Sequence, residues 1–191
     1  MRRREDSGRV PRPLFAFVAL AAGVVLALLV QTLVLQVYRV PSASMRPTLV
    51  PGDRVLVDKV SGMWRPLRRG DVIVFDATDV WSPETDGVLV VKRIVGLPGD
   101  HVVCCDASGR IVRNGEHLRE GYALRARVPR HFDVVVPVGR LWVMGDDRAV
   151  SLDSSAYTHV PGGGSVPVND VVGRVVAVVW PVRHAGILGT P

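Results

Sequence analysis

The chain has 191 residues, of which 48% are hydrophobic and 22% are charged. This length suits one domain with an accessory segment, since compact domains usually contain ~100–200 residues, and the composition excludes a disordered polyelectrolyte. The formal net charge of +6 is concentrated at the start, where five Arg against two acidic residues give residues 1–13 a charge of +3; the rest is spread too thinly to indicate nucleic-acid binding.

The first predicted element is a transmembrane helix over 14–38, a stretch without a charged residue. A helix of ~23 residues is about 35 Å long, enough to cross a hydrocarbon core of ~30 Å. Basic residues precede this stretch and only Arg39 follows it closely, so the positive-inside rule places residues 1–13 in the cytoplasm and residues 39–191 outside it. The alternative is a cleaved secretory signal peptide, but its apolar region is usually only ~7–15 residues long. We therefore expect a retained single-pass anchor.

The residues after 39 alternate between apolar and polar and are rich in Val, which is typical of β-strands. Asn114-Gly115 is the strongest hairpin signal, because a type I′ turn needs positive φ at both central residues. No long helical periodicity occurs, so we predict a mainly β domain built on a coiled or closed sheet. The predicted strands are Arg54–Val60, Asp71–Asp76, Gly87–Val95, His101–Cys104, Arg110–Arg113, Asp133–Val136, Arg140–Met144 and Val171–Trp180.

The two cysteines, Cys104 and Cys105, are adjacent, which excludes a disulfide-stapled scaffold and a four-ligand zinc site. Neighbouring Cα atoms ~3.8 Å apart lie below the usual disulfide range, so we favour two unpaired thiols, with a vicinal bridge as the alternative. The five His are scattered without metal-ligand spacing. We expect neither a metal nor a cofactor.

The segment Val40–Leu49 carries two hydroxyl groups, on Ser42 and Ser44, between two prolines. Taken alone, it is better explained as a polar linker between membrane and domain than as a site. The lysines change this interpretation. Only two of the 24 basic residues are Lys, namely Lys59 and Lys92, and Lys, unlike Arg, can lose its proton when it is buried.

Lys92 falls in a predicted strand and shares a face with Val90 and Ile94. Burial on an aliphatic face can lower a lysine pKa by up to ~3–5 units, which would produce a neutral amine able to take a proton from serine. The alternative is a lysine whose stem packs while its amine reaches water. Lys59 also shares a face with two valines, so spacing alone does not choose between the two lysines.

At these residues the chain resembles the bacterial type I signal peptidases, membrane-anchored Ser/Lys endopeptidases that remove signal peptides from exported preproteins. The resemblance covers nearly the whole chain in ordered motifs, and it implies an accessory insertion at about residues 100–140, a small β-hairpin subdomain inserted into the catalytic domain. The matching motifs are Pro41–Leu49, Gly52–Lys59, Arg69–Phe75, Val91–Asp100, Met144–Arg148 and Ser151–Ser154.

The resemblance implies a catalytic dyad, with Ser44 as nucleophile and Lys92 as general base, which settles the choice against Lys59. It further implies that the Ser42 hydroxyl joins the Ser44 N–H in the oxyanion hole, and that Ser151 orients the lysine amine.

Other residues take supporting and binding roles in this interpretation. Asp146 and Arg93 match a supporting ion pair, and Asp153 belongs to the same network. The implied substrate pocket accepts small side chains, so that cleavage follows Ala-x-Ala-like sites. Its residues are Val40, Met45, Leu49 and Val91.

The last motif departs from the family's usual GDNRDNSxDSR, because residues 145–155 read GDDRAVSLDSS. Asp153 thereby loses its usual local partner, since Ser155 replaces an arginine. This departure favours an alternative hypothesis, a catalytically impaired paralogue that binds signal peptides without cutting them. A self-cleaving repressor-type Ser/Lys protease is disfavoured by the apolar anchor and the lack of a DNA-reading domain. The expected partners are signal peptides of exported preproteins, membrane lipid and the secretion translocon.

Overall fold

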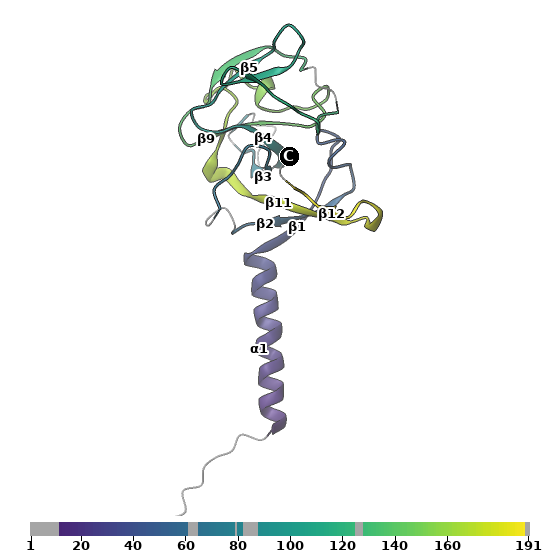
Figure 1. Cartoon of the computed structure of the whole chain (residues 1–191). Coiled ribbons are helices and arrows are strands. Elements are labelled where there is room, and N and C mark those ends of the chain that lie inside the picture. The colour runs from purple at the N-terminus through teal and green to yellow at the C-terminus, as the bar shows by residue number, and fades with distance from the viewer. Residues whose placement is uncertain (1–11, 61–64, 79, 82–87, 125–127, 190–191) are drawn as a thin grey trace, which may run out of the picture.

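The computed structural model describes residues 12–60, 65–78, 80–81, 88–124 and 128–189. Within these ranges, a helix leads into a body built from two β-sheets (Figure 1). The elements are α1 (Arg12–Leu33), β1 (Leu35–Arg39), β2 (Arg54–Asp58), β3 (Val72–Asp76), β4 (Leu89–Gly96), β5 (His101–Cys104), β6 (Ile111–Arg113), β7 (Glu116–His117), β8 (Phe132–Val135), β9 (Arg140–Met144), η2 (Ser154–Ala156), β10 (Val166–Pro167), η3 (Val168–Asp170), β11 (Val171–Trp180), η4 (Val182–His184) and β12 (Gly186–Ile187).

Helix α1 is shorter at its C-terminal end than the predicted helix over 14–38. It ends at Leu33, and Leu35–Arg39 is strand β1 instead, paired antiparallel with β2. The backbone groups of β1 find partners on the edge of β2, a long-range interaction that an uncharged run of sequence does not reveal. Among the described residues, we find no helix whose length and hydropathy together suffice to cross a lipid bilayer. The basic segment 1–13 lies outside the described residues up to residue 11.

The larger sheet has eight strands in the order β1-β2-β11-β3-β4-β9-β10, with β12 added to β11. Its pairs are antiparallel, and in the described ranges it runs as an open path, without the pairing between first and last strands that a closed sheet needs. Strand β4 lies in the middle, where Lys92 is opposite Ile73 of β3 and Arg93 is opposite Met144 of β9. Because β4 has a neighbouring strand on each side, Lys92 lies in the interior of the sheet and its side chain is buried.

Strand β3 shows why the body has two apolar layers. Its alternate residues point to opposite faces, as in any strand, and both faces are buried. Val72 and Val74 pack in a cluster that includes Met45 and Leu49. Ile73 and Phe75 pack in a second cluster on the other face. The segment that contains Ser44 is therefore anchored by apolar side chains against one face of the large sheet.

The segment expected as an accessory insertion contains the second sheet, with the strand order β7-β6-β5-β8. The turn predicted at Asn114-Gly115 is confirmed, because both residues have positive φ and Arg113 pairs with Glu116 across it. The accessory segment is larger than the predicted β-hairpin, because it forms a sheet of four strands. This sheet lies at the end of the body away from α1 (Figure 1), and its core includes Trp142 and Met144 of β9.

All eight predicted strands are present in the structure. Strands β5, β9 and β11 have the predicted bounds, and five others agree within two residues at each described end. The strands that sequence reasoning missed are β1 and the two-residue elements β7, β10 and β12. The preferred prediction for the cysteines is wrong, because Cys104 and Cys105 form a vicinal disulfide and neither thiol is free.

Candidate active site

The central feature of the site is a contact between two side chains that the sequence singled out. The Nζ atom of Lys92, on β4, lies 2.8 Å from the Oγ atom of Ser44. Ser44 follows β1 in a turn-rich segment whose backbone is tied to another loop, because the Asp147 N–H donates to the Ser44 carbonyl at 3.0 Å. Both side chains are buried.

Lys92 is in the environment that its sequence neighbours indicated. Only 3% of its surface is exposed, and this burial lowers the pKa of its amine to about 8, against the opposing attraction of the Asp153 and Asp146 carboxylates. A substantial fraction of the amine is thus neutral in mildly alkaline solution. Lys59 lies elsewhere, at the end of β2, with its amine 3.5 Å from Gln36 Oε1 in an exposed contact.

Of the two residues expected to assist the dyad, the structure places one in direct contact. The Ser42 hydroxyl oxygen lies 3.1 Å from Ser44 Oγ. Ser151 is buried nearby, but its hydroxyl has no hydrogen-bond partner among the described residues, so the expected contact with the lysine amine is not formed. Ser151 and Ser44 both lie against Gly145. A Cβ atom added to Gly145 would collide with Ser151 Oγ and would stand 2.5 Å from the Ser44 carbonyl oxygen.

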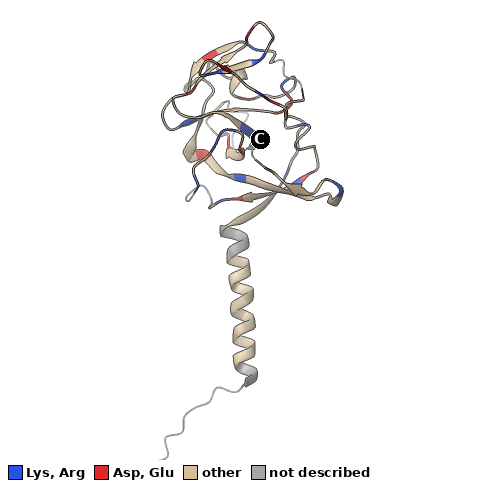
Figure 2. Cartoon of the chain, viewed as in Figure 1, with Lys and Arg blue, Asp and Glu red and all other residues tan. Residues whose placement is uncertain are grey.

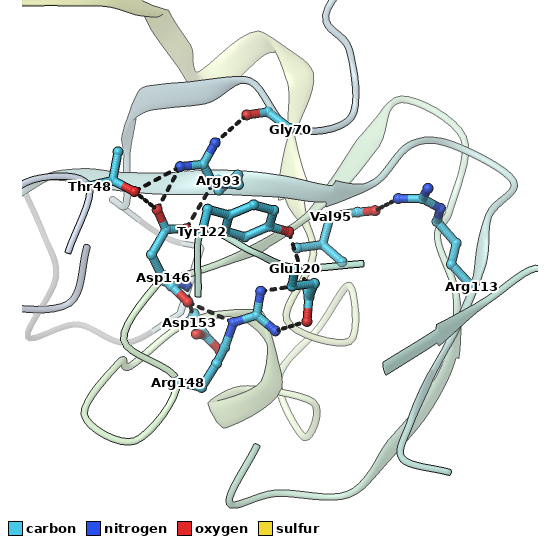
Figure 3. Close-up of polar contacts among 11 residues, drawn as sticks. Thr48, Gly70, Arg93, Val95, Arg113, Glu120, Tyr122, Asp146, Arg148 and Asp153 are labelled. Atoms are coloured by element: carbon cyan, nitrogen blue, oxygen red, sulfur yellow. Dashed lines mark hydrogen bonds and ion pairs between the residues drawn. The ribbon is translucent and has the colours of Figure 1, made fainter. Parts of the chain in front are cut away.

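The pairing of Arg93 with Asp146 is present and buried. The Arg93 Nε and one terminal nitrogen donate to the two carboxylate oxygens at 2.8 and 2.6 Å. Thr48, in the segment that carries Ser44, donates its hydroxyl to the same carboxylate at 2.5 Å. The second terminal nitrogen of Arg93 donates to the Gly70 carbonyl. This cluster, shown in Figure 3, links strand β4, which carries Lys92, to the segment Val40–Leu49, which carries Ser44.

Asp153 has new partners in place of the arginine that its motif lacks. It accepts hydrogen bonds from the Gly145 N–H at 3.0 Å, the Ser155 N–H at 3.1 Å and the Ser155 hydroxyl at 2.7 Å. Ser155, the residue that departs from the family pattern, therefore satisfies the carboxylate locally.

A cleft of about 200 Å³ opens beside the Ser44–Lys92 pair. Of the four residues expected to line it, Val40, Met45 and Val91 do so. Leu49 does not, because it is fully buried in the apolar cluster behind the cleft. The lining residues that sequence reasoning missed are Tyr38, Arg39, Pro41, Val74, Val88, Leu89 and Val90.

Sequence reasoning also missed Glu120 and Tyr122, which reach the Arg93–Asp146 cluster from the accessory segment. Neither residue belongs to a catalytic motif, and only tertiary contacts bring them here. No three His, Cys, Asp or Glu side chains in the described part of the chain gather as a metal site. The arrangement offers acid–base and nucleophilic chemistry from protein groups.

The family model described as "Signal peptidase, peptidase S26" matches residues 14–180. The chain belongs to this signal peptidase family. It is 38% identical over 170 residues to signal peptidase I of Leptolyngbya laminosa, an alignment that covers 88% of this chain and 80% of that protein. It is 34% identical over 220 aligned positions to signal peptidase I of Mycobacterium tuberculosis, covering 91% of this chain and 74% of the relative.

Among solved structures, a signal peptidase I from Enterococcus faecalis V583 aligns with a TM-score of 0.45 and 28% identity, covering 58% of this chain and 97% of that one. The family match and the sequence relatives identify this peptidase as a serine endopeptidase of the S26 family. The resemblance inferred from the motifs is thereby confirmed.

Proposed function

We propose that this peptidase is a membrane-bound endopeptidase that cleaves signal peptides from exported preproteins, with Ser44 as nucleophile and Lys92 as general base. The observation that carries the proposal is the 2.8 Å contact between a buried lysine amine and a serine hydroxyl. The names of the relatives support the substrate class.

In the proposed reaction, neutral Lys92 accepts the proton of the Ser44 hydroxyl while Ser44 Oγ attacks the carbonyl carbon of the scissile peptide bond. The negative charge that develops on the carbonyl oxygen is stabilised by the Ser44 N–H and the Ser42 hydroxyl. The Lys92 ammonium then gives its proton to the leaving amine, and the C–N bond breaks. Lys92 next takes a proton from the water that attacks the acyl-enzyme ester. The Lys92 ammonium then returns a proton to Ser44 Oγ as the ester C–O bond breaks, which releases the carboxylic acid product and restores the neutral amine and the serine hydroxyl.

The cleft supports a preference for small side chains next to the scissile bond. Its volume of about 200 Å³ and its lining by Val40, Met45 and Val91 favour Ala over larger residues. A preprotein with Leu in place of Ala before the cut is expected to be cleaved more slowly by at least about 10-fold, since a difference of a single methylene in an apolar pocket already changes the rate by about this much.

We also propose that the uncharged residues 14–33 of α1 anchor the peptidase in the membrane, with residues 1–13 inside and the β-rich body outside the cytoplasm. The described side chains of α1 carry no charge (Figure 2), and its large apolar residues are exposed. Several exposed apolar side chains of the body support contact with lipid, since they belong to β11, β12 and their connection, close to where α1 joins the body (Figure 1). They are Val179, Trp180, Val182 and Ile187.

The test is processing of a purified preprotein by the full-length chain in detergent or liposomes. Ser44→Ala and Lys92→Ala should each abolish cleavage, and Lys92→Arg should fail as well, because a guanidinium does not give up its proton in a protein. The matched controls are Ser108→Ala and Lys59→Ala, which should cleave at the parent rate. Cleavage by Lys92→Arg would overturn the dyad.

The impaired-paralogue alternative predicts that signal peptides bind without turnover, even at elevated pH. The departures in the last motif leave its buried charges satisfied, since Asp153 has three donors and Arg148 is paired with Glu120. This supports an active enzyme. Binding without product in the same assay would favour the alternative.

A further inference from the structure

A short part of the accessory segment, residues 118–124, reaches the charged cluster beside the Ser44–Lys92 pair. Its backbone is fixed there, because the Leu124 N–H donates to the Asp146 carbonyl at 3.0 Å. Two of its side chains, Glu120 and Tyr122, lie among Arg93, Asp146 and Arg148 in Figure 3.

Tyr122 covers the guanidinium group of Arg93. The carbon at the centre of that group lies 4.2 Å from the centre of the tyrosine ring, a distance at which a cation is attracted to the ring face. The Tyr122 hydroxyl donates to Glu120 Oε1 at 2.9 Å, so the ring is held in this position. Arg93 is therefore confined between the ring and the Asp146 carboxylate that it binds with two hydrogen bonds.

Glu120 holds the second buried arginine of the cluster. Its carboxylate accepts two hydrogen bonds from Arg148, at 2.9 and 2.6 Å, and both side chains are almost fully buried. The Arg148 Nε donates to the Gly145 carbonyl at 2.8 Å. Gly145 itself packs against the Ser44 carbonyl and Ser151 Oγ. Glu120 is thus connected through Arg148 and Gly145 to the backbone of Ser44.

These contacts differ in kind from ordinary packing, because buried cations demand specific partners. A buried guanidinium without a carboxylate is strongly unfavourable, and removal of one partner leaves the other charge unsatisfied. The last motif contributes Asp146 for Arg93, whereas the carboxylate that binds Arg148 comes from the accessory segment. The accessory segment is therefore electrostatically required at the site.

We propose that Glu120 and Tyr122 are positioning residues, which act through Arg148 and Arg93 to hold Gly145 and Asp146 so that Ser44 and Lys92 stay within hydrogen-bonding distance. This inference rests on the proposed role of the Ser44–Lys92 dyad. Its consequence is that residues 118–124 of the accessory segment contribute to turnover although none of them lines the substrate cleft.

The scarcity of lysine provides a direct measurement. Because Lys59 and Lys92 are the only lysines, protein labelled with ¹³C at the lysine side chain gives two titrating NMR signals, with Lys59 as internal reference. The groups that act on Lys92 are Asp153 and Asp146, which raise its pKa, and the Ser44 hydroxyl that it contacts. When Tyr122 no longer confines Arg93, Asp146 is less well neutralised and attracts the ammonium more strongly, so the Lys92 midpoint should rise.

The experiment compares the full-length chain with Tyr122→Leu, Tyr122→Phe and Glu120→Gln in detergent, well below the unfolding temperature. Tyr122→Leu and Glu120→Gln should lower kcat by about 10- to 100-fold, the cost expected for a small misplacement of reacting groups, with little change in KM. Tyr122→Phe keeps the ring over Arg93 and should retain most of the activity. The control is Glu116→Gln, which changes an exposed carboxylate of β7 and should alter neither kcat nor the Lys92 midpoint.

Folded Tyr122→Leu and Glu120→Gln proteins with the parent kcat and the parent Lys92 midpoint would overturn the inference. So would a loss of activity that only follows a loss of folded protein while the Lys92 midpoint stays unchanged, since that result assigns a structural role alone. Lys92→Ala is measured in parallel. If it still cleaves, the proposed dyad fails, whereas the Lys92 titration in the Tyr122 variants continues to report on positioning.

Discussion

The amine of Lys92 and the hydroxyl of Ser44 lie 2.8 Å apart although 48 positions separate them in the chain. The distance is set from both sides. Lys92 is held in the middle of the large sheet, on β4 between β3 and β9. Ser44 is held by its backbone contact with Asp147 and by the packing of Met45 in the core. Neither residue can move independently of the fold.

The rate of cleavage should depend on pH through Lys92. Because only the neutral amine can accept the serine proton, and burial lowers the Lys92 pKa to about 8, kcat/KM should rise with pH and level off above about 8. The measurement is a pH profile with a signal-peptide substrate, with Lys59→Ala as a control of identical shape. A rate that stays constant from about pH 6 to about pH 9 would contradict this assignment.

Replacement of Lys92 by Met should make the fold more stable while abolishing cleavage. The folded-state pKa of Lys92 is lowered from 10.5 to about 8, so below pH 8 the ammonium is destabilising by on the order of 3 kcal/mol. Lys92→Met removes this destabilising charge, so its free energy of unfolding at pH 7 should exceed that of the parent protein by part of this amount. In the parent protein, stability should rise between about pH 8 and about pH 10.5, where the unfolded chain binds the proton and the folded chain does not. Denaturant titrations at several pH values would show this rise, and its presence in Lys92→Met would exclude Lys92 as the source.

Loss of the Ser42 hydroxyl should lower kcat. Removal of one donor from an oxyanion hole typically costs ~10²–10³-fold in turnover, and Ser42 Oγ lies 3.1 Å from Ser44 Oγ, close enough to serve the same carbonyl. Ser42→Ala should show this loss in steady-state kinetics, with a smaller effect for Ser42→Thr, which keeps the hydroxyl. Equal activity of Ser42→Ala and the parent would assign the oxyanion contact to other groups.

Asp146→Ala should destabilise the fold severely. It leaves Arg93 buried without a carboxylate, a change that usually costs about 3–5 kcal/mol. The matched control is Asp133→Ala, since Asp133 is 72% exposed and pairs with His101 at the surface, where ion pairs contribute at most ~1 kcal/mol. Urea unfolding of both variants would separate them, and equal midpoints would mean that water reaches Arg93.

Gly145→Ala should inactivate the enzyme. The added Cβ would stand 2.5 Å from the Ser44 carbonyl oxygen and collide with Ser151 Oγ, so the serine segment must shift. Displacement of about 1 Å can cost ~10²-fold in rate. Gly189→Ala is the control, because nothing lies within 4 Å of its added Cβ. Normal cleavage by Gly145→Ala would show that the serine segment tolerates the shift.

Local pattern was sufficient to predict most of the β-rich body. The runs that form β5, β9 and β11 are predicted with correct bounds, because they are rich in Val and other apolar residues typical of strands and are bordered by turn residues. The turn at Asn114-Gly115 was also predictable, since its positive φ angles depend on those two residues alone. The family motifs identified Ser44 and Lys92 as a pair, a choice that spacing could not make between Lys92 and Lys59.

Long-range contacts decided the rest. Strand β1 exists because the edge of β2 offers it hydrogen bonds, although its own sequence continues an apolar run. The amine of Lys92 is near Ser44 because β4 is an interior strand of the large sheet. Glu120 reaches Arg148 because the segment that follows β7 is hydrogen-bonded to the Asp146 carbonyl through the Leu124 N–H. Such contacts depend on how strands far apart in the chain pair and pack, and the free energy that selects one pairing belongs to the whole core rather than to any single segment. The sequence by itself therefore determined most of the strands and the reactive residues, whereas the tertiary structure decided strand β1, the distances between the reactive residues and their partners.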